Sequence, residues 1–172
     1  MDGTQLVEHS LARIQAGFNR ILDGLTEEQL SYRPSRSANS IAWLLWHLTR
    51  VQDNHISDLL GEDQVWVSQN WCETFNLPPD TTNTGYGHGP DEVAGIKGDA
   101  QAILGYYGAV FESSKRLLNK LSPEDLDIEL DEPQYNPLPT IGVRLISIIS
   151  DNTQHVGQAA YLRGLILSQD KN

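Results

Sequence analysis

The sequence predicts an all-α protein: a four-helix bundle of up-down-down-up topology, with one long crossover between its second and third helices. Three observations predict this architecture. Four long segments repeat apolar residues in steps of four and three, the spacing of one helix face. No segment shows the alternation of apolar and polar residues that is typical of a half-buried strand. The connection between the second and third segments is far longer than antiparallel neighbours need.

The first helix is expected over Thr4–Gly24, where one apolar face is continuous. Asp2 or Thr4 can cap its start, because either side chain can accept a hydrogen bond from a free backbone N–H group. The apolar face consists of Val7, Leu11, Ile14, Phe18, Ile21 and Leu25.

The second helix is expected over Asn39–Leu60. It follows the helix-breaking Pro34, with Asn39 or Ser40 as its cap, and Gly61 ends it. Its apolar face consists of Ile41, Leu44, Leu45, Leu48, Val51, His55 and Leu59.

The third and fourth helices are expected over Pro90–Leu121 and Thr140–Ser168. Proline suits the first turn of the third helix, and Thr140 can cap the fourth. The third face consists of Val93, Ile96, Ala100, Ile103, Tyr107, Val110, Ser114, Leu117 and Leu121. The fourth consists of Ile141, Leu145, Ile148, Asn152, His155, Ala159, Leu162 and Ile166.

The connections differ in kind. Thr26–Gln29 and Ser122–Asp125 have the pattern of capping boxes, which predicts a short helix at each place. Gly61–Gly89 is long, irregular and rich in tryptophan, proline and glycine. A connection of this length is a lid, a binding loop or a crossover between parallel helices, and the crossover fits the bundle.

Composition limits the possible functions. The 172 residues suit one domain, 1–172, and 12 basic against 23 acidic residues give a net charge of −11. This charge repels nucleic acids and anionic membranes, so neither is expected as a partner. No apolar run approaches the ~20 residues needed to span a bilayer. Cys72 is the single cysteine and no signal peptide is visible, so a cytoplasmic location is expected.

The fourth helix carries a candidate metal-binding pair. Asp151 and His155 are four residues apart, so their side chains lie one turn apart on one face. Such a pair can hold a metal ion. Alternatively, Asp151 orients a buried histidine by a hydrogen bond. The second helix offers His47 or His55 as a further ligand, but these lie about 80° apart around the axis, so one site is not expected to use both. For His55, a hydrogen-bonded boundary histidine is the favoured interpretation.

Other reactive residues give weaker signals. His88 lies in a glycine-rich stretch, Gly85–Gly89, that could hold an anion at a helix start but is better explained as a hinge. Cys72 fits a small apolar core residue better than a nucleophile, since no histidine is fixed near it. His9 is expected at the surface of the first helix.

Three segments together resemble one known family. Ser40–Arg50 (SIAWLLWHLTR) resembles the second-helix signature of the DinB/YfiT-like superfamily. Asp151–Gln158 (DNTQHVGQ), with Tyr161–Gly164 after it, resembles the last-helix signature, and Gln64–Val93 is similar to the interhelical region of actinobacterial-type members. The resemblance implies an up-down-down-up bundle and kinship with mycothiol-dependent maleylpyruvate isomerase.

The resemblance also implies a divalent metal held by His47, Asp151 and His155. Zinc is expected first, with nickel, iron and manganese as alternatives. Asp151 departs from the family pattern, because many members have histidine there and the isomerase branch has glutamate. Characterised relatives use such a site with low-molecular-weight thiols such as mycothiol or bacillithiol. Relatives often dimerise, so a homodimer is a candidate assembly.

The expected activity is that of a thiol-dependent transferase or isomerase, or of a hydrolase if water takes the open metal position. The alternative is a non-catalytic metal- or small-molecule-binding stress-response protein built on the same bundle. A pocket wall for the thiol or another small molecule could include Trp66, Trp71, Tyr86, His88 and Gln158. These aromatic residues could equally pin the long connection onto the bundle.

Overall fold

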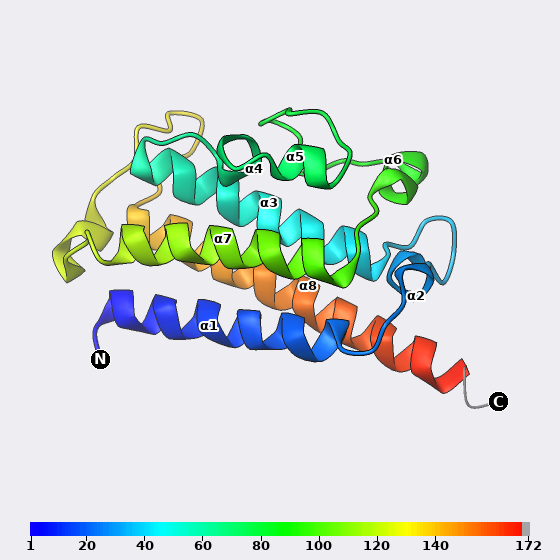
Figure 1. Cartoon of the computed structure of the whole chain (residues 1–172). Coiled ribbons are helices and arrows are strands. Elements are labelled where there is room, and N and C mark those ends of the chain that lie inside the picture. Colours follow the sequence, from blue (N-terminus) through cyan, green and yellow to red (C-terminus); the bar gives the residue numbers. More distant parts are fainter. Residues whose placement is uncertain (170–172) are drawn as a thin grey trace.

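Four long helices form the body of the molecule. The structure is a computed structural model that describes residues 1–169, so the last three residues of the expected domain, 170–172, lie outside the described residues. The long helices are α1 (Gly3–Leu22), α3 (Ile41–Leu60), α7 (Ala100–Leu118) and α8 (Ile141–Gln169). In Figure 1, α1 and α8 run in one direction while α3 and α7 run in the other. The predicted four-helix bundle is confirmed, and these directions follow the up-down-down-up order.

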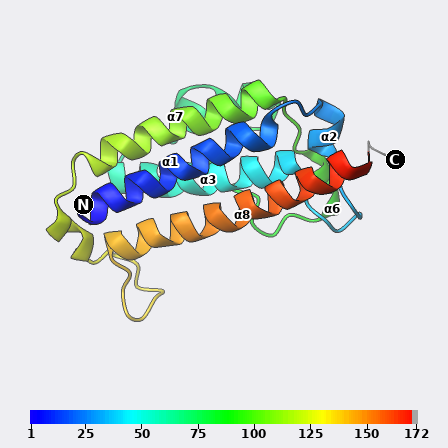
Figure 2. The ribbon, with the colours of Figure 1, turned by 90° about the horizontal axis from the view of Figure 1, so that it is seen from below.

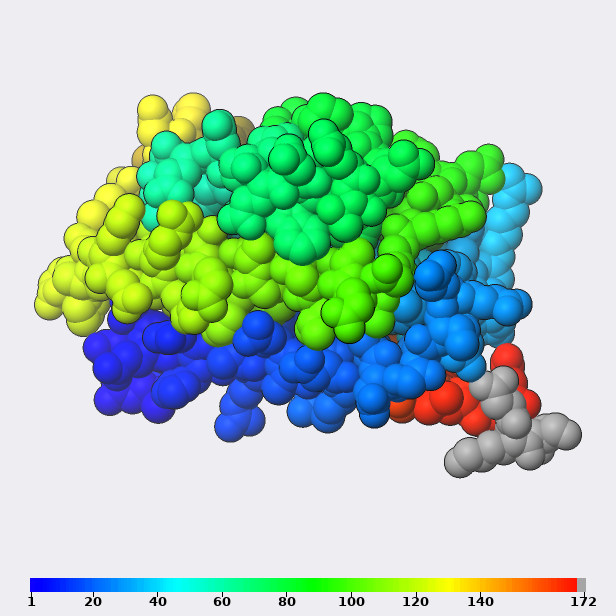
Figure 3. Space-filling view, in the orientation of Figure 1, coloured from blue at the N-terminus to red at the C-terminus, as the bar shows by residue number. Residues whose placement is uncertain are grey.

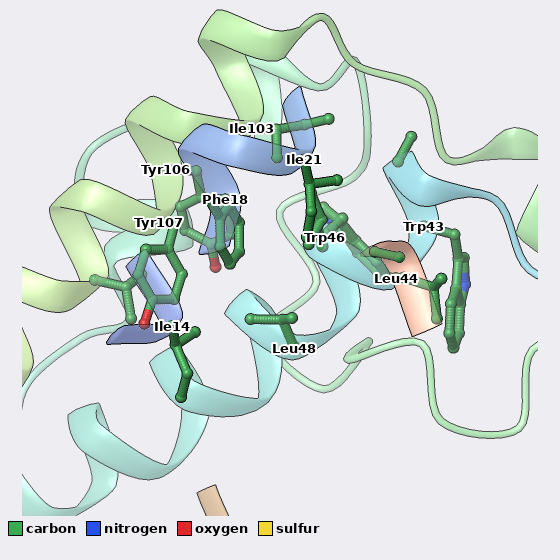
Figure 4. Close-up of a cluster of buried hydrophobic side chains, with 14 of the residues drawn as sticks. Ile14, Phe18, Ile21, Trp43, Leu44, Trp46, Leu48, Ile103, Tyr106 and Tyr107 are labelled. Carbon is green, nitrogen blue, oxygen red and sulfur yellow. The ribbon is translucent and has the colours of Figure 1, made fainter. Parts of the chain in front are cut away.

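Each long helix packs against two others. Both α1 and α3 contact α7 and α8, so α3 and α7 are parallel neighbours and α3 and α8 are antiparallel ones, as Figures 1 and 2 show. The apolar faces expected from the sequence meet at the centre of the bundle. Phe18 of α1 stacks on Tyr107 of α7 with 4.2 Å between ring centroids (Figure 4). The described residues contain no β-strand, only an isolated bridge between Glu129 and Thr140.

The caps that begin these helices are the polar residues expected from the sequence. The Asp2 side chain accepts a hydrogen bond from the Gln5 N–H at the start of α1, and the Ser40 hydroxyl accepts one from the Trp43 N–H of α3. At α8 the Thr140 hydroxyl accepts from the Val143 N–H. Gly61 ends α3 in a left-handed conformation with φ 66°.

Both predicted connecting helices are present. Thr26 and Gln29 form the capping box of α2 (Glu27–Ser31), and Ser122 and Asp125 form that of η1 (Pro123–Asp127), a 3₁₀-helix. These short elements turn the chain at the two ends of the bundle.

The prediction of one continuous third helix over Pro90–Leu121 is wrong. This segment is divided into α6 (Pro90–Gly95) and α7, which begins at Ala100. Gly95 ends α6, Gly98 lies within the break, and the Asp99 carboxylate caps α7 by accepting from the Ala102 N–H at 2.7 Å. A Cβ atom at Gly98 would lie 2.8 Å from the Phe75 ring, so the crossover packs closely on this break. Val93 and Ile96 are still buried, which explains the unbroken apolar spacing.

The crossover between α3 and α6 contains two single-turn helices, α4 (Val65–Ser68) and α5 (Trp71–Thr74). Figure 3 shows this segment, in teal and green, covering the upper side of the bundle above α7. Its path joins the end of α3 to the opposite end of the molecule, as parallel helices require. No helix in the described part of the chain is long and apolar enough to cross a membrane.

Candidate metal centre

The packing of α3 on α8 brings together the three residues that the sequence singled out. The candidate ligand atoms of His47, Asp151 and His155 all lie within 4.8 Å of one another. The His155 Nε2 atom is 3.3 Å from Asp151 Oδ1, and the two imidazole rings meet edge to face at 4.9 Å between centroids. We refer to these three residues as the His47 cluster. His47 is only 6% exposed, whereas Asp151 and His155 are half-buried.

Hydrogen bonds hold both imidazole rings by their Nδ1 atoms. His47 Nδ1 lies 2.5 Å from the carbonyl oxygen of Thr84 in the crossover, and only a donating N–H makes this contact favourable. His155 Nδ1 lies 2.9 Å from Gln158 Oε1, one turn further along α8. Metal-binding histidines are commonly oriented in this way, with the second ring nitrogen left for the cation. In both residues that second atom is Nε2.

The two histidines have opposite electrostatic environments. Burial lowers the pKa of His47, more than the Thr84 carbonyl and the Asp151 charge raise it. Burial also acts to lower the pKa of His155, but hydrogen bonds to Asp151 and Gln158 outweigh it, so the pKa of His155 is raised. His47 therefore favours the neutral form that can ligate a metal. The negative charge of Asp151 favours the protonated form of His155.

The donor set of the His47 cluster fits a divalent cation. Asp151 Oδ2 is buried and, among the described residues, has no hydrogen-bond partner. A buried carboxylate oxygen without a partner is costly, and a cation would satisfy it. Two imidazole nitrogens and one carboxylate oxygen are also the ligands of catalytic zinc sites that keep an open position.

His88 is not a fourth ligand, because both of its ring nitrogens already make hydrogen bonds. The Trp43 indole N–H donates to His88 Nδ1 at 3.2 Å, and His88 Nε2 lies 2.9 Å from Asn83 Oδ1. Both ring nitrogens are thereby occupied. Trp43 in turn stacks on His47 with 4.6 Å between ring centroids, so His88 and Trp43 together restrict the orientation of that ligand.

Gly85 allows the crossover to approach the His47 cluster. Its φ angle is +92°, a region that residues with a Cβ atom rarely adopt. A Cβ atom there would lie 2.9 Å from the Trp46 ring, 3.0 Å from His47 Nδ1 and 3.3 Å from the Trp43 ring. The absence of a side chain at this position therefore lets the backbone close over His47.

A second polar cluster anchors the same crossover, and it was not predicted from the sequence. Arg50 is fully buried and forms an ion pair with Asp53 at 3.5 Å. Its guanidinium also donates to Gln64 Oε1 and Tyr106 Oη, and it lies over the Trp66 ring. We call Arg50, Asp53, Gln64 and Tyr106 the Arg50 cluster. Further donations from Arg50 reach three backbone carbonyls of the crossover, those of Asp80, Thr81 and Asn83.

A signal for this burial existed in the sequence. The segment 40–48 is apolar on nearly every side, which is typical of a helix enclosed all round rather than on one face. Arg50, two residues after this segment, requires buried partners if the enclosure continues. Three of those partners are backbone carbonyls of the irregular crossover. No sequence pattern indicates where a backbone carbonyl points, so these partners could not be predicted.

The five residues predicted to line a pocket do not lie together at one site. Trp66 is buried against Trp46 and Tyr106, and Trp71 packs on Gly105 and Tyr106. These contacts pin the crossover to the bundle rather than lining the His47 cluster. Tyr86 is 93% exposed. Gln158 contacts His155 of the cluster directly, whereas His88 contacts Trp43, which stacks on His47.

The other candidate residues lie outside the cluster. The His55 Nδ1 atom accepts a hydrogen bond from Arg144 at 3.1 Å, which agrees with its interpretation as a boundary histidine. Cys72 is a free, buried thiol among core residues, and His9 is exposed on α1.

Comparisons with known proteins agree with this fold. The model of the mycothiol-S-transferase family (MST) matches residues 6–167. A crystal structure of a conserved protein from Enterococcus faecalis is similar to this chain, with a TM-score of 0.89 and 33% sequence identity, covering 98% of this chain and 99% of that one. No curated protein matches the sequence. Since the family match extends over nearly the whole bundle, the chain belongs to the mycothiol-S-transferase family.

Proposed function

We propose that this protein is a metal-dependent enzyme that transfers a low-molecular-weight thiol to an organic electrophile, with His47, Asp151 and His155 as the metal ligands. The observation that carries the proposal is the buried, unpartnered Asp151 Oδ2 beside two imidazoles held by their Nδ1 atoms. Family membership supports the thiol-transferase class.

The bound metal would act as a Lewis acid that lowers the pKa of a thiol entering its open position, so that the reactive thiolate forms at neutral pH. The chain's own residues orient the site: Thr84 and Gln158 fix the ligand rings, and Asp151 supplies the negative charge. The thiol would release its proton to solvent, and its sulfur would donate an electron pair to an electrophilic carbon while the leaving group departs with the electron pair of its bond.

Zinc suits this donor set best, with nickel, iron and manganese as alternatives. The thiol we propose is of the mycothiol type, as the family description indicates. A cytoplasmic location and a small-molecule rather than nucleic-acid partner fit the acidic composition and the single, buried cysteine.

The test is metal content in protein purified without a metal-affinity column. We expect close to one divalent metal per chain by elemental analysis in the wild type, and loss of that metal in His47→Ala and His155→Ala. Helical content measured by circular dichroism should persist, because apolar faces rather than the metal build the core. His9→Ala is the matched control, since His9 is exposed on α1, and it should keep its metal.

Thiol binding separates the enzyme from its alternative. Addition of a thiol should change the absorption spectrum of the cobalt-substituted protein, because sulfur would enter the metal coordination. Metal binding with no thiol response would instead support a non-catalytic metal-binding protein. Full metal retention by both histidine variants would contradict the site assignment.

A further inference from the structure

A hollow of about 390 Å³ lies beside α3 and the first turns of α8, and it has no role in the site described above. Its outer wall is the connection 128–140, which projects beside the start of α8 in Figure 2. A second hollow shares four of its lining residues: His55, Glu132, Tyr135 and Arg144. The two together form one depression next to the bundle.

The floor of this hollow is polar, and its cation is paired. The Arg144 side chain is 11% exposed and is paired with Glu132 and with Asp58. Burial and the neighbouring Arg144 lower the pKa of His55 to about 4, although Asp58 and Asp151 act in the other direction. His55 is therefore neutral at physiological pH. Its Nδ1 accepts from Arg144, so its proton is on Nε2, for which the described residues provide no acceptor.

The walls are mainly apolar. Val143 on α8 is 50% exposed, although a residue of this type is usually buried. An uncharged, largely apolar molecule with one hydrogen-bond acceptor would match these walls and the free N–H group of His55. Anions are disfavoured, because Asp58 and Asp131 line the adjoining hollow. The apolar wall is formed by Tyr135, Pro137, Leu138, Pro139 and Val143.

The hollow and the His47 cluster lie along the same two helices, α3 and α8. Ser147, which lines it, is one helical turn before Asp151 on α8, a rise of about 6 Å. His55 is two turns beyond His47 on α3, a rise of about 12 Å. The hollow is thus separated from the candidate metal ligands by one to two helical turns along α3 and α8.

We propose that this hollow binds the second substrate, an uncharged and largely apolar electrophile whose acceptor atom takes the hydrogen bond from His55 Nε2. The identification of the occupant as the electrophile rests on the proposed function, whereas the binding site itself does not need the metal. The reactive carbon would face the His47 cluster, and the remainder of the molecule would lie on the proline-rich wall.

The test is a titration of the metal-free full-length protein with prodan, an uncharged naphthalene ketone whose emission reports its surroundings. Val143→Glu places a charge on the apolar wall at a half-exposed helix position, and it should weaken prodan binding by about tenfold or more. Ile146→Glu is the matched control, because Ile146 is exposed on the same helix but does not line the hollow. It should bind within about twofold of wild type.

Two further measurements identify the hydrogen bond and the occupant. His55→Phe should retain prodan but shift its emission to shorter wavelength, because the ketone loses its donor. Chlorodinitrobenzene, an uncharged electrophile with nitro acceptors, should displace prodan, whereas mercaptoethanol should not.

Equal binding by Val143→Glu and wild type would overturn the proposal, as would equal losses in both glutamate variants or displacement by mercaptoethanol. Metal content is measured separately in every variant. Protein that holds metal but no prodan refutes the hollow alone, and protein that binds prodan but no metal refutes the proposed enzyme alone.

Discussion

Two polar clusters lie about one turn apart on α3, and they differ in how completely their atoms are paired. In the Arg50 cluster, Asp53 accepts hydrogen bonds from Tyr106, from Ser57 and from the backbone N–H groups of Val65 and Trp66. In the His47 cluster, one oxygen of Asp151 has no hydrogen-bond partner among the described residues.

This difference separates architecture from chemistry. A buried charge that is fully paired holds elements in place, and here the Arg50 cluster fastens the crossover to α3 and α7. A buried polar atom left unpaired lowers stability, and a ligand that bonds to it would remove this cost. The following predictions test whether stability depends on the first cluster and ligand binding on the second.

The largest effect on stability is expected from Asp53→Ala. It leaves the buried Arg50 charge and the donors around it without their acceptor, which should lower the free energy of unfolding by about 3–5 kcal/mol. Urea denaturation followed by circular dichroism measures this. If the variant does not fold, Tyr106→Phe removes only the hydroxyl that donates to Asp53 and accepts from Arg50, and it should cost about 1–2 kcal/mol. A loss below that range in both variants would mean that the cluster is not a structural anchor.

The next effect is a pH dependence that arises from His55, a third polar group on α3. Its pKa is about 4 in the folded protein, and its ordinary value is 6.5. Between these values the unfolded chain binds a proton and the folded chain does not, so stability falls as pH decreases from 6.5 to 4, by up to about 3 kcal/mol. Below pH 4 this contribution no longer changes. Denaturation at several pH values, with His55→Phe as the control, measures it. An unchanged pH slope in the variant would contradict the assignment.

A smaller effect is expected from Gln158→Ala, and it should affect binding rather than stability. The Gln158 side chain fixes the His155 ring through Nδ1, and loss of such an orienting group weakens metal binding by about 10–100-fold. Competition with a chromophoric chelator gives the affinity. Gln154→Ala on the same helix is the control, since its amide bonds to Ser150 rather than to the cluster. Equal affinities in the two variants would show that Gln158 has no orienting role.

The smallest effect is expected from Asp91→Asn. Arg36 and Asp91 form an ion pair at 3.2 Å, comparable in length to that of Arg50 and Asp53, but their side chains are 79% and 91% exposed. Exposed pairs contribute little, so the free energy of unfolding should change by less than about 0.5 kcal/mol. A thermal melt compared with that of Asp53→Ala shows whether burial, rather than the ion pair itself, determines the contribution.

Sequence reasoning predicted most of the helical framework, because apolar spacing and caps are local. It missed the break before α7, although Gly95, Gly98 and Asp99 are helix-ending and capping residues. Buried Val93 and Ile96 kept the apolar spacing intact across that break. Within the His47 cluster, the spacing of Asp151 and His155 was readable from one helix, whereas the choice of His47 depended on the family resemblance.

The contributions of the crossover could not be predicted in the same way. Thr84 orients His47 through a backbone carbonyl, and Arg50 is held by three more such groups. Every residue carries a carbonyl, so the direction in which it points depends on the three-dimensional path of the chain and not on residue type.

The hydrogen bond between Thr84 and His47 also couples ligand binding at the His47 cluster to motion of the crossover. Thermodynamic coupling is reciprocal, so an occupied site that holds His47 more firmly also holds the crossover more firmly. Local opening of this segment should then become rarer when metal is bound, and proteases should cut it more slowly. The longest irregular stretch of the chain would therefore act as a reporter of occupancy, readable by limited proteolysis or hydrogen exchange without any knowledge of the substrate.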